Sequence, residues 1–317
     1  MRYIEDLREE MMVNDVYFCR KKQELLTKAG KTYYSLILQD KTGNLDGKVW
    51  NVTSGGIDEF SSLDYIHVQG RVTSFQGSLQ LNIERVRKCG EGEYDEADYM
   101  PCSKKNVGEM YQELVSFVQS VKEPHLQQLL KQFFVEDGDF KKKFSAHSAA
   151  KSVHHGFIGG LLEHTLAVTK MCDFFAKTYP IINRDLLVTA AMFHDMGKLT
   201  ELSGFPENDY TDAGQLLGHI YIGAHLVENA CDNIADFPPT LKRELIHCIL
   251  AHHGELEYGS PKKPAIVEAF ALNFADNVDA KFETLLELMS GGEESNLEWL
   301  GFQRTLDTNI RRTSRRD

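Results

Sequence analysis

The spacing of apolar residues changes along this chain, from every second residue before residue 88 to a helical period after residue 106. Residues 65–72 read Tyr-Ile-His-Val-Gln-Gly-Arg-Val, and residues 79–83 alternate in the same way, which is typical of half-buried strands. Beyond the change, Met110, Leu114 and Phe117 recur at steps of four and three, which is typical of amphipathic helices. The chain therefore contains a β region and an α region, and two domains are predicted.

The β region is predicted to form a small barrel. Five strands are expected around residues 16–19, 33–38, 45–52, 65–72 and 79–83, with a short helix at 56–60. Turn sequences at 41–44 and 74–78 separate two of the strand pairs. Five strands with a helix between the third and fourth are the order of an OB-fold barrel, a fold that binds single-stranded nucleic acids.

The chain divides into four predicted segments. They are a barrel at 1–90, a linker at 91–105 rich in glycine and acidic residues, an all-α bundle at 106–300, and a polar basic tail at 301–317. The helices expected around the chemically interesting residues cover 161–177, 185–196, 214–235, 240–252 and 264–290. The predicted fold class is multi-domain, with an all-β OB-fold barrel followed by an all-α bundle.

Composition excludes several classes of protein. The 317 residues include 35 basic and 47 acidic side chains, and the net charge of −12 argues against a protein that wraps duplex DNA. The charge is uneven, because residues 1–90 carry 13 basic and 12 acidic groups (13 − 12 = +1), which leaves −13 for the rest. No apolar run reaches the ~18 residues of a membrane span, and the N-terminus lacks a secretory signal. The six cysteines form no Cys-x-x-Cys pair. We therefore expect a cytoplasmic protein that has no membrane partner.

Histidine and aspartate side chains lie on the apolar faces of five predicted helices. They are His164, the pair His194-Asp195, His219, the pair His252-His253, and Asp276. His252, for example, follows Cys248 by four residues and Leu245 by seven, which places it on the buried face. Buried polar groups without partners cost roughly 1–3 kcal/mol each. Because imidazole and carboxylate groups that converge on a divalent cation avoid this cost, the pattern predicts a metal site.

The order His164, His194-Asp195, Asp276 resembles the HD-domain superfamily of metal-dependent phosphohydrolases, which is named for the His-Asp pair. Residues 194–198, His-Asp-Met-Gly-Lys, match the H-D-x-G-K form of that family. The resemblance implies that His164, His194, Asp195 and Asp276 hold one metal ion and that Asp195 can bridge to a second.

Further roles are implied by the same resemblance. His219, with His252 or His253, marks the binuclear branch of the superfamily, so all three are candidate metal ligands. Asp195 and Lys198 are the candidate catalytic residues, with Lys198 close to the substrate phosphate. A simpler role for Lys198, as a cation stabilised at a helix C-terminus, stays open.

An OB barrel followed by an HD domain resembles the YhaM-type 3′–5′ exoribonucleases of Gram-positive bacteria. Family-like stretches lie at residues 39–43, 48–50, 159–165, 215–219 and 251–261. The resemblance implies metal-dependent removal of nucleotides from the 3′ end of single-stranded RNA, with the barrel guiding the strand and single-stranded DNA as a second candidate substrate. Manganese is the expected cofactor, as one ion or two, and iron, nickel, cobalt and magnesium stay open.

Aromatic and basic residues of the barrel are candidates for nucleic-acid binding, by base stacking and by neutralising phosphates. The six chosen residues are Phe18, Tyr34, Lys41, Trp50, Arg71 and Phe75. Strand alternation separates Tyr33 from Tyr34, so only one of the two can face the groove. A core position stays open for each aromatic residue, and Phe75, in a polar turn, fits the core least.

Two other functions stay open. One is an HD enzyme for a small nucleotide, and the other is a nucleic-acid-binding module whose HD domain is regulatory. A cyclic-dinucleotide phosphodiesterase of the HD-GYP type is disfavoured, because residues 254–261 read Gly-Glu-Leu-Glu-Tyr-Gly-Ser-Pro in place of its Gly-Tyr-Pro signature. A homo-oligomer is compatible with apolar stripes on acidic helices. No role is assigned to His154-His155 or to the basic tail.

Overall fold

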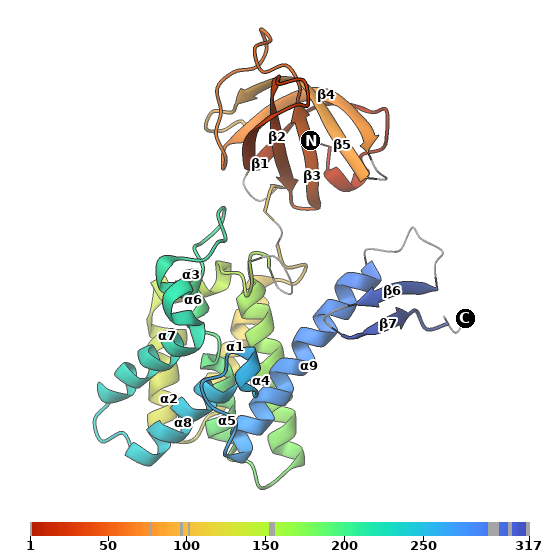
Figure 1. Ribbon diagram of the computed structural model, residues 1–317. Coiled ribbons are helices and arrows are strands. Elements are labelled where there is room, and N and C mark those ends of the chain that lie inside the picture. The colour runs from red at the N-terminus through yellow and green to blue at the C-terminus, as the bar shows by residue number, and fades with distance from the viewer. Residues whose placement is uncertain are drawn as a thin grey trace. The chain divides into compact units, whose positions relative to one another are not determined.

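The structure, a computed structural model, describes residues 2–314 apart from 76–77, 96–97, 101, 152–155, 291–297 and 304–305. Its contacts divide the chain into two compact units. One consists of Met1–Cys102 with Phe205–Glu207, and the other of Ser103–Gly204 with Asn208–Asp317. Figure 1 shows that the first is built from strands and the second mainly from helices. The predicted fold class, an OB-fold barrel followed by a helical bundle, is confirmed.

The first unit is a closed barrel with the strand order β1-β2-β3-β5-β4. After a 3-10 turn η1 (Ile4–Asp6), the strands are β1 (Met12–Leu26), β2 (Thr32–Asp40), β3 (Gly43–Val49), β4 (Tyr65–Phe75) and β5 (Ser78–Lys88). Strands β3 and β5 pair in parallel, the other neighbours are antiparallel, and β1 pairs with β4 to close the barrel. This five-stranded arrangement is that of an OB-fold.

Alternation along the strands fills the barrel core. On β4, Ile66, Val68 and Val72 are buried, whereas His67, Gln69 and Arg71 between them are partly or fully exposed. The helix predicted at 56–60 was wrong. That stretch is extended, because Val86 of β5 donates its N–H to Gly56 and accepts one from Asp58, which ties the segment to the sheet.

Part of the predicted linker packs on the barrel. Tyr94 stacks on Tyr65 with ring centroids 3.7 Å apart, and Tyr99 meets the same ring edge-on. The Asp98 carboxylate accepts hydrogen bonds from the Tyr3 hydroxyl and the Lys41 ammonium, each at 2.8 Å. These contacts join the segment to the first unit, which the glycine-rich and acidic composition did not indicate.

The second unit is a helical bundle centred on one long helix. Its elements are α1 (Val107–Ser120), α2 (Pro124–Lys131), the π-helical turn η3 (Gln132–Glu136), α3 (Gly138–Ala146), α4 (Gly160–Thr178), α5 (Arg184–Phe193), α6 (Lys198–Glu201), α7 (Asp212–Asp232), α8 (Pro239–Ala251), η4 (Leu256–Tyr258) and α9 (Val267–Ser290). Helix α4 packs against α1, α3, α5 and α9. Among the described residues, no helix is long and apolar enough to cross a membrane.

Helix α5 ends at Phe193, three residues before the predicted end, and residues 194–197 form a turn that leads into α6. Gly197 has a helical backbone (φ −61°), so it does not end α5 in a left-handed conformation. A Cβ at this position would lie 2.7 Å from the Gly223 nitrogen of α7. The glycine therefore allows the turn to approach α7 closely.

Helix α7 is kinked where the sequence predicts a continuous helix. Gly218 has φ 72° and ψ 153°, a backbone conformation that glycine adopts at little cost. His219 follows this kink directly, so its backbone N–H is not committed to a regular helical bond and donates to Glu201 Oε1 at 2.9 Å. The kink thus sets the position of a candidate ligand.

The segment predicted as a polar tail contains a small antiparallel ribbon. Its strands are β6 (Trp299–Gln303) and β7 (Thr308–Arg311). An ion pair between Arg311 and Glu298 contributes to it. Short strands flanked by charged residues give a weak sequence pattern, which explains why the ribbon was missed. All six cysteines of the chain are free thiols.

Candidate metal centre

The predicted ligands converge in the helical unit. His164 comes from α4, the pair His194-Asp195 follows α5, and His219 lies on α7 just after the kink. The remaining three are His252 and His253 after α8 and Asp276 on α9. They form two groups, His164 with His194 and Asp276, and His219 with His252 and His253, each with candidate ligand atoms within 4.8 Å of one another.

Asp195 lies between the two groups and is almost completely buried. Its Oδ2 is 3.3 Å from His164 Nε2 and 3.5 Å from His194 Nε2. Its Oδ1 is 3.5 Å from His219 Nε2 and 3.7 Å from His252 Nε2. Each carboxylate oxygen therefore faces one group, which is the geometry that a bridging ligand needs.

The histidines share one orientation, with Nδ1 toward a protein oxygen, which leaves Nε2 as the candidate ligand atom. The Nδ1 partners are Asp279 Oδ2 for His164 (2.7 Å), Ala191 O for His194 (2.7 Å), Glu201 Oε1 for His219 (2.9 Å), Ile249 O for His252 (2.7 Å) and Tyr258 O for His253 (2.9 Å). Because these oxygens accept hydrogen bonds, Nδ1 donates and the imidazole orientation is fixed. Metal-binding histidines have this arrangement in general.

Three buried polar atoms at the centre have no hydrogen-bond partner among the described residues: Asp195 Oδ1, His219 Nε2 and His252 Nε2. Buried polar atoms of this kind are rare in proteins and need a compensating partner. A divalent cation would compensate all three, and a set of imidazole and carboxylate ligands suits first-row transition ions. The residues present therefore fit a metal ion.

The electrostatics differ between the two groups. Burial alone would lower the pKa of His164, but hydrogen bonds to Asp195, Asp276 and Asp279 raise that pKa well above its usual value. Burial, assisted by the neighbouring histidines, lowers the pKa of His252 well below its usual value. The carboxylate-rich group thus holds a proton that a cation would displace, since metal binding releases protons from its ligands.

Lys198, at the start of α6, contacts the centre directly. Its Nζ lies 2.6 Å from Asp195 Oδ2. Burial works against the charged forms of both groups, but their attraction raises the pKa of Lys198 and, with the adjacent histidines, holds the pKa of Asp195 well below its usual value. Both side chains are therefore charged at neutral pH.

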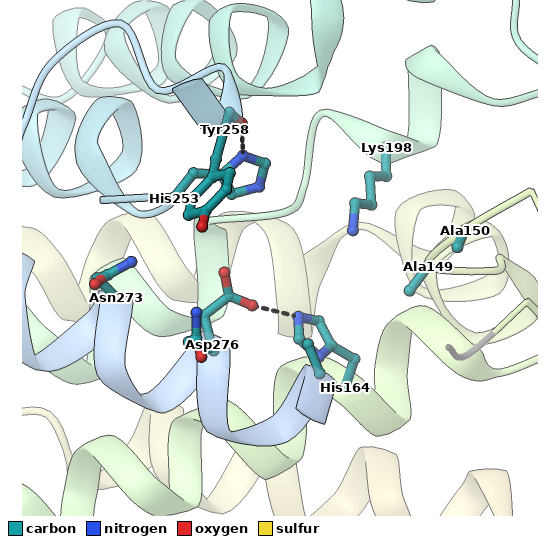
Figure 2. Close-up of a pocket in the computed structure, with 10 residues that line it drawn as sticks. Ala149, Ala150, His164, Lys198, His253, Tyr258, Asn273 and Asp276 are labelled. Carbon is teal, nitrogen blue, oxygen red and sulfur yellow. Dashed lines mark hydrogen bonds and ion pairs between the residues drawn. The ribbon is translucent and has the colours of Figure 1, made fainter. Parts of the chain in front are cut away.

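A cavity of about 420 Å³ opens on the first group of ligands. Its lining includes His164, Lys198, His253 and Asp276, together with Tyr258, Asn273, Asn277, Ala149, Ala150 and Ala280. Figure 2 shows Tyr258 and His253 on one side of this cavity and Lys198 with the two alanines at 149 and 150 on the other. The volume is within the range of small-molecule sites.

Sequence reasoning missed the residues that hold the ligands. Asp279 is three residues after Asp276 on α9, so helical spacing could have identified it. Glu201 is 18 residues from His219, and no periodic pattern links the two. The pair His154-His155 lies outside the described residues.

On the barrel, one of the predicted aromatic residues occupies the core. Phe18 is fully buried and packs against Tyr65, so its prediction as a stacking residue was wrong. Hydrophobic burial at Phe18 favours the core role that the sequence left open. Tyr34 is partly buried at the margin of the core, where it packs edge-on against Phe60 with Lys22 Nζ 4.2 Å from its ring centroid, and its role in binding stays a prediction.

The other four predicted contacts are accessible. Trp50 is 45% exposed and Phe75 61% exposed. Tyr33, the neighbour of Tyr34, stacks on Trp50 with ring centroids 4.9 Å apart. Two basic residues form ion pairs at the surface, Lys41 with Asp98 and Arg71 with Glu10. The stack is therefore partly accessible, with Trp50 exposed and Tyr33 partly buried.

Comparisons with known proteins agree with this architecture. A family model described as the HD domain matches residues 161–281. The 3′–5′ exoribonuclease YhaM of Geobacillus sp. (strain WCH70) is 32% identical over 284 residues, which cover 88% of this chain and 86% of that protein.

Two solved structures are similar to parts of the chain. The second OB-fold domain of replication protein A from Methanococcus maripaludis has 22% identity and a TM-score of 0.23, and covers 30% of this chain and 98% of that chain. A replication protein A heterotrimer bound to single-stranded DNA has 18% identity and a TM-score of 0.22, and covers 28% of this chain and 64% of that chain.

Proposed function

The chain belongs to the YhaM family of 3′–5′ exoribonucleases, and we propose that it hydrolyses single-stranded RNA from the 3′ end at the His–Asp centre of its HD domain. The observation that carries the proposal is Asp195, whose two oxygens each face one group of buried ligands. Single-stranded DNA is a second proposed substrate.

Two divalent ions are proposed as cofactors. His164, His194, Asp276 and Asp195 Oδ2 would hold one, and His219, His252, His253 and Asp195 Oδ1 the other. We favour manganese, and iron, cobalt, nickel and magnesium are the alternatives that these ligands allow. Bound divalent ions supply an activated water molecule at neutral pH and positive charge for the phosphoryl oxygens.

The protein's own groups orient the reaction. Asp279 and Glu201 fix the His164 and His219 rings through Nδ1, so that Nε2 points to the centre. The Lys198 ammonium lines the cavity and would stabilise the negative charge that develops on the phosphate. A cavity of about 420 Å³ suits one terminal nucleotide better than a duplex. This size restriction favours cleavage from an end.

The barrel is proposed to hold the single strand. The partly exposed Tyr33–Trp50 stack and the exposed Phe75 would contact bases, since aromatic stacking is tolerant of sequence. Lys41 and Arg71 would contact phosphates, because their surface ion pairs are weak and can be exchanged. The six free thiols fit the reducing cytoplasm, which we propose as the compartment.

A self-associated state is also part of the proposal. Helix α9 exposes Phe270, Phe274 and Phe282, an apolar set that a second copy could cover. Analytical ultracentrifugation of the purified protein measures this directly. A single monomeric species across micromolar concentrations would contradict it.

A time course on 5′-labelled single-stranded RNA with Mn²⁺ tests the proposed activity. The expected result is a ladder that shortens from the 3′ end and that is absent with EDTA and with a 3′-blocked strand. Intact RNA under these conditions would contradict the proposal. If nucleoside phosphates were cleaved in the same buffer, the small-nucleotide enzyme would take its place.

A further inference from the structure

Tyr258 lines the cavity beside the metal centre, yet its side chain has no part in the chemistry described above. It is the last residue of η4, five residues after the candidate ligand His253, and is 68% exposed. Large aromatic side chains contribute binding energy when they are covered by a ligand. An exposed tyrosine that lines this cavity is therefore available for substrate.

The turn that carries Tyr258 is held at both ends. The Tyr258 carbonyl accepts a hydrogen bond from His253 Nδ1 at 2.9 Å. The buried Ser260 hydroxyl lies 2.9 Å from the carbonyl oxygens of Leu250 and Lys262, to which it can donate. The backbone of Tyr258 thus orients a metal ligand while its side chain remains free to bind. This separation means that the ring can be changed without loss of the histidine contact.

Other residues of the cavity wall suit a nucleoside. Ala149, Ala150 and Ala280 are small, which leaves room for a ring system. Asn277, on α9, lines the cavity, and its side-chain amide forms no hydrogen bond with the other described residues, whereas the nearby Asn273 amide donates to the His252 carbonyl at 2.8 Å. One amide is thus structural and the other is available for a polar ligand group.

We propose that Tyr258 and Asn277 form the subsite for the 3′-terminal nucleoside, with the base stacked on the Tyr258 ring and the Asn277 amide bonded to a polar group of the sugar or base. This inference rests on the proposed exonuclease activity. The phosphate of the same nucleotide would then reach Lys198 and the ligands across the cavity. Because every base has an aromatic face, the subsite accepts all four bases.

The test uses the full-length protein and a trinucleotide RNA. So short a strand limits the contribution that contacts elsewhere on the protein can make. Tyr258→Ala is expected to raise KM about 10-fold, the size of a lost base stack, while Tyr258→Phe and Tyr258→Trp stay near wild type. The matched control is Tyr179→Ala, because Tyr179 is 56% exposed at the end of α4 and does not line the cavity.

Metal content is measured on the same samples. Tyr258→Ala with wild-type manganese content and a raised KM supports the subsite. An unchanged KM overturns it, and so does a loss of manganese, which would mean that the substitution acts through His253. An inactive wild type would contradict the proposed function itself, so the two failures are distinguishable.

Asn277→Ala gives a second, smaller readout. Removal of one hydrogen bond to substrate is expected to raise KM about 3-fold with kcat nearly unchanged. A fall in kcat with an unchanged KM would contradict a role in holding the terminal nucleoside. The double variant Tyr258→Ala with Asn277→Ala should have a higher KM than either single variant.

Discussion

The two units of the molecule differ in the exposure of their candidate functional residues, which are mainly buried in the helical unit and mainly exposed on the barrel. The helical unit buries His194, Asp195 and His252, whereas the barrel exposes Trp50 and Phe75. Buried polar groups must find partners, so each one restricts what the surrounding structure can be. An exposed aromatic residue costs little and restricts little. The first kind of site can therefore be inferred from the sequence more securely than the second.

The largest effect is expected when the carboxylate between the two groups of ligands is removed. Asp195→Asn should reduce hydrolysis by at least about 1,000-fold, because several kcal/mol of transition-state stabilisation are lost with the metal ligands disrupted. Its affinity for RNA, measured by fluorescence anisotropy, should stay within about 3-fold of wild type if the barrel supplies most of the binding. Asp236→Asn, at an exposed position with φ 56°, is the control. An active Asp195→Asn protein would show that the centre is not catalytic.

A second test compares core and surface within the barrel. Phe18→Ala should destabilise the barrel by about 3–5 kcal/mol, as expected for a fully buried phenylalanine. Phe75→Ala should change stability by no more than about 0.5 kcal/mol, because the ring is 61% exposed. Urea unfolding followed by circular dichroism measures both. Equal effects of the two substitutions would contradict the assignment of Phe18 to the core.

A third test asks whether the Tyr33–Trp50 stack binds RNA. Trp50→Ala should weaken binding of single-stranded RNA about 10-fold, since each stacked base contributes about 1–3 kcal/mol. Hydrolysis of a trinucleotide should remain near wild type. The control is Met12→Ala, an apolar residue of β1 that is 53% exposed. Wild-type affinity of the Trp50 variant would leave the barrel without a demonstrated role in binding.

The smallest effect concerns a buried carboxylate whose partners are protein groups. Asp173 on α4 contacts Arg184 Nε at 2.7 Å and Lys177 Nζ at 2.6 Å. Burial alone would raise the pKa of Asp173, but these two ion pairs lower it below its usual value. A lowered folded-state pKa contributes stability above the unfolded pKa of about 3.9, and this contribution is lost as pH falls through the folded value.

Asp173→Asn should therefore cost about 1 kcal/mol at pH 7, and the difference from wild type should shrink below pH ~4. Thermal unfolding across pH measures the difference. EDTA should leave it unchanged, unlike the behaviour expected at Asp195, because Asp173 needs no cation. A difference that is constant with pH would contradict the electrostatic origin.

The sequence predicted the parts of the fold that depend on regular spacing. Alternation along β4 identified Ile66, Val68 and Val72 as core, and helical spacing identified His164, His252 and Asp276 as inward-facing. The irregular parts were not predictable in this way. Gly197 allows a close approach to α7, and Gly218 adopts a positive φ within that helix. Neither role produces a periodic pattern in the sequence.

The residues that position the ligands show the same limit. Glu201 reaches His219 only because α6 and α7 fold against each other, so the contact is tertiary. On the barrel, strand alternation predicted that Tyr33 and Tyr34 face opposite sides of the sheet, but it did not indicate which of the two sides is the core. In the structure both rings are partly buried, with Tyr33 stacked on Trp50 and Tyr34 packed against Phe60 at the margin of the core.

Anomalous diffraction from crystals grown with Mn²⁺ would locate the metal ions directly. Two anomalous peaks are predicted at the manganese edge, one among His164, His194 and Asp276 and one among His219, His252 and His253, with Asp195 between them. No peak at either group would contradict the assignment of these buried side chains to a metal centre.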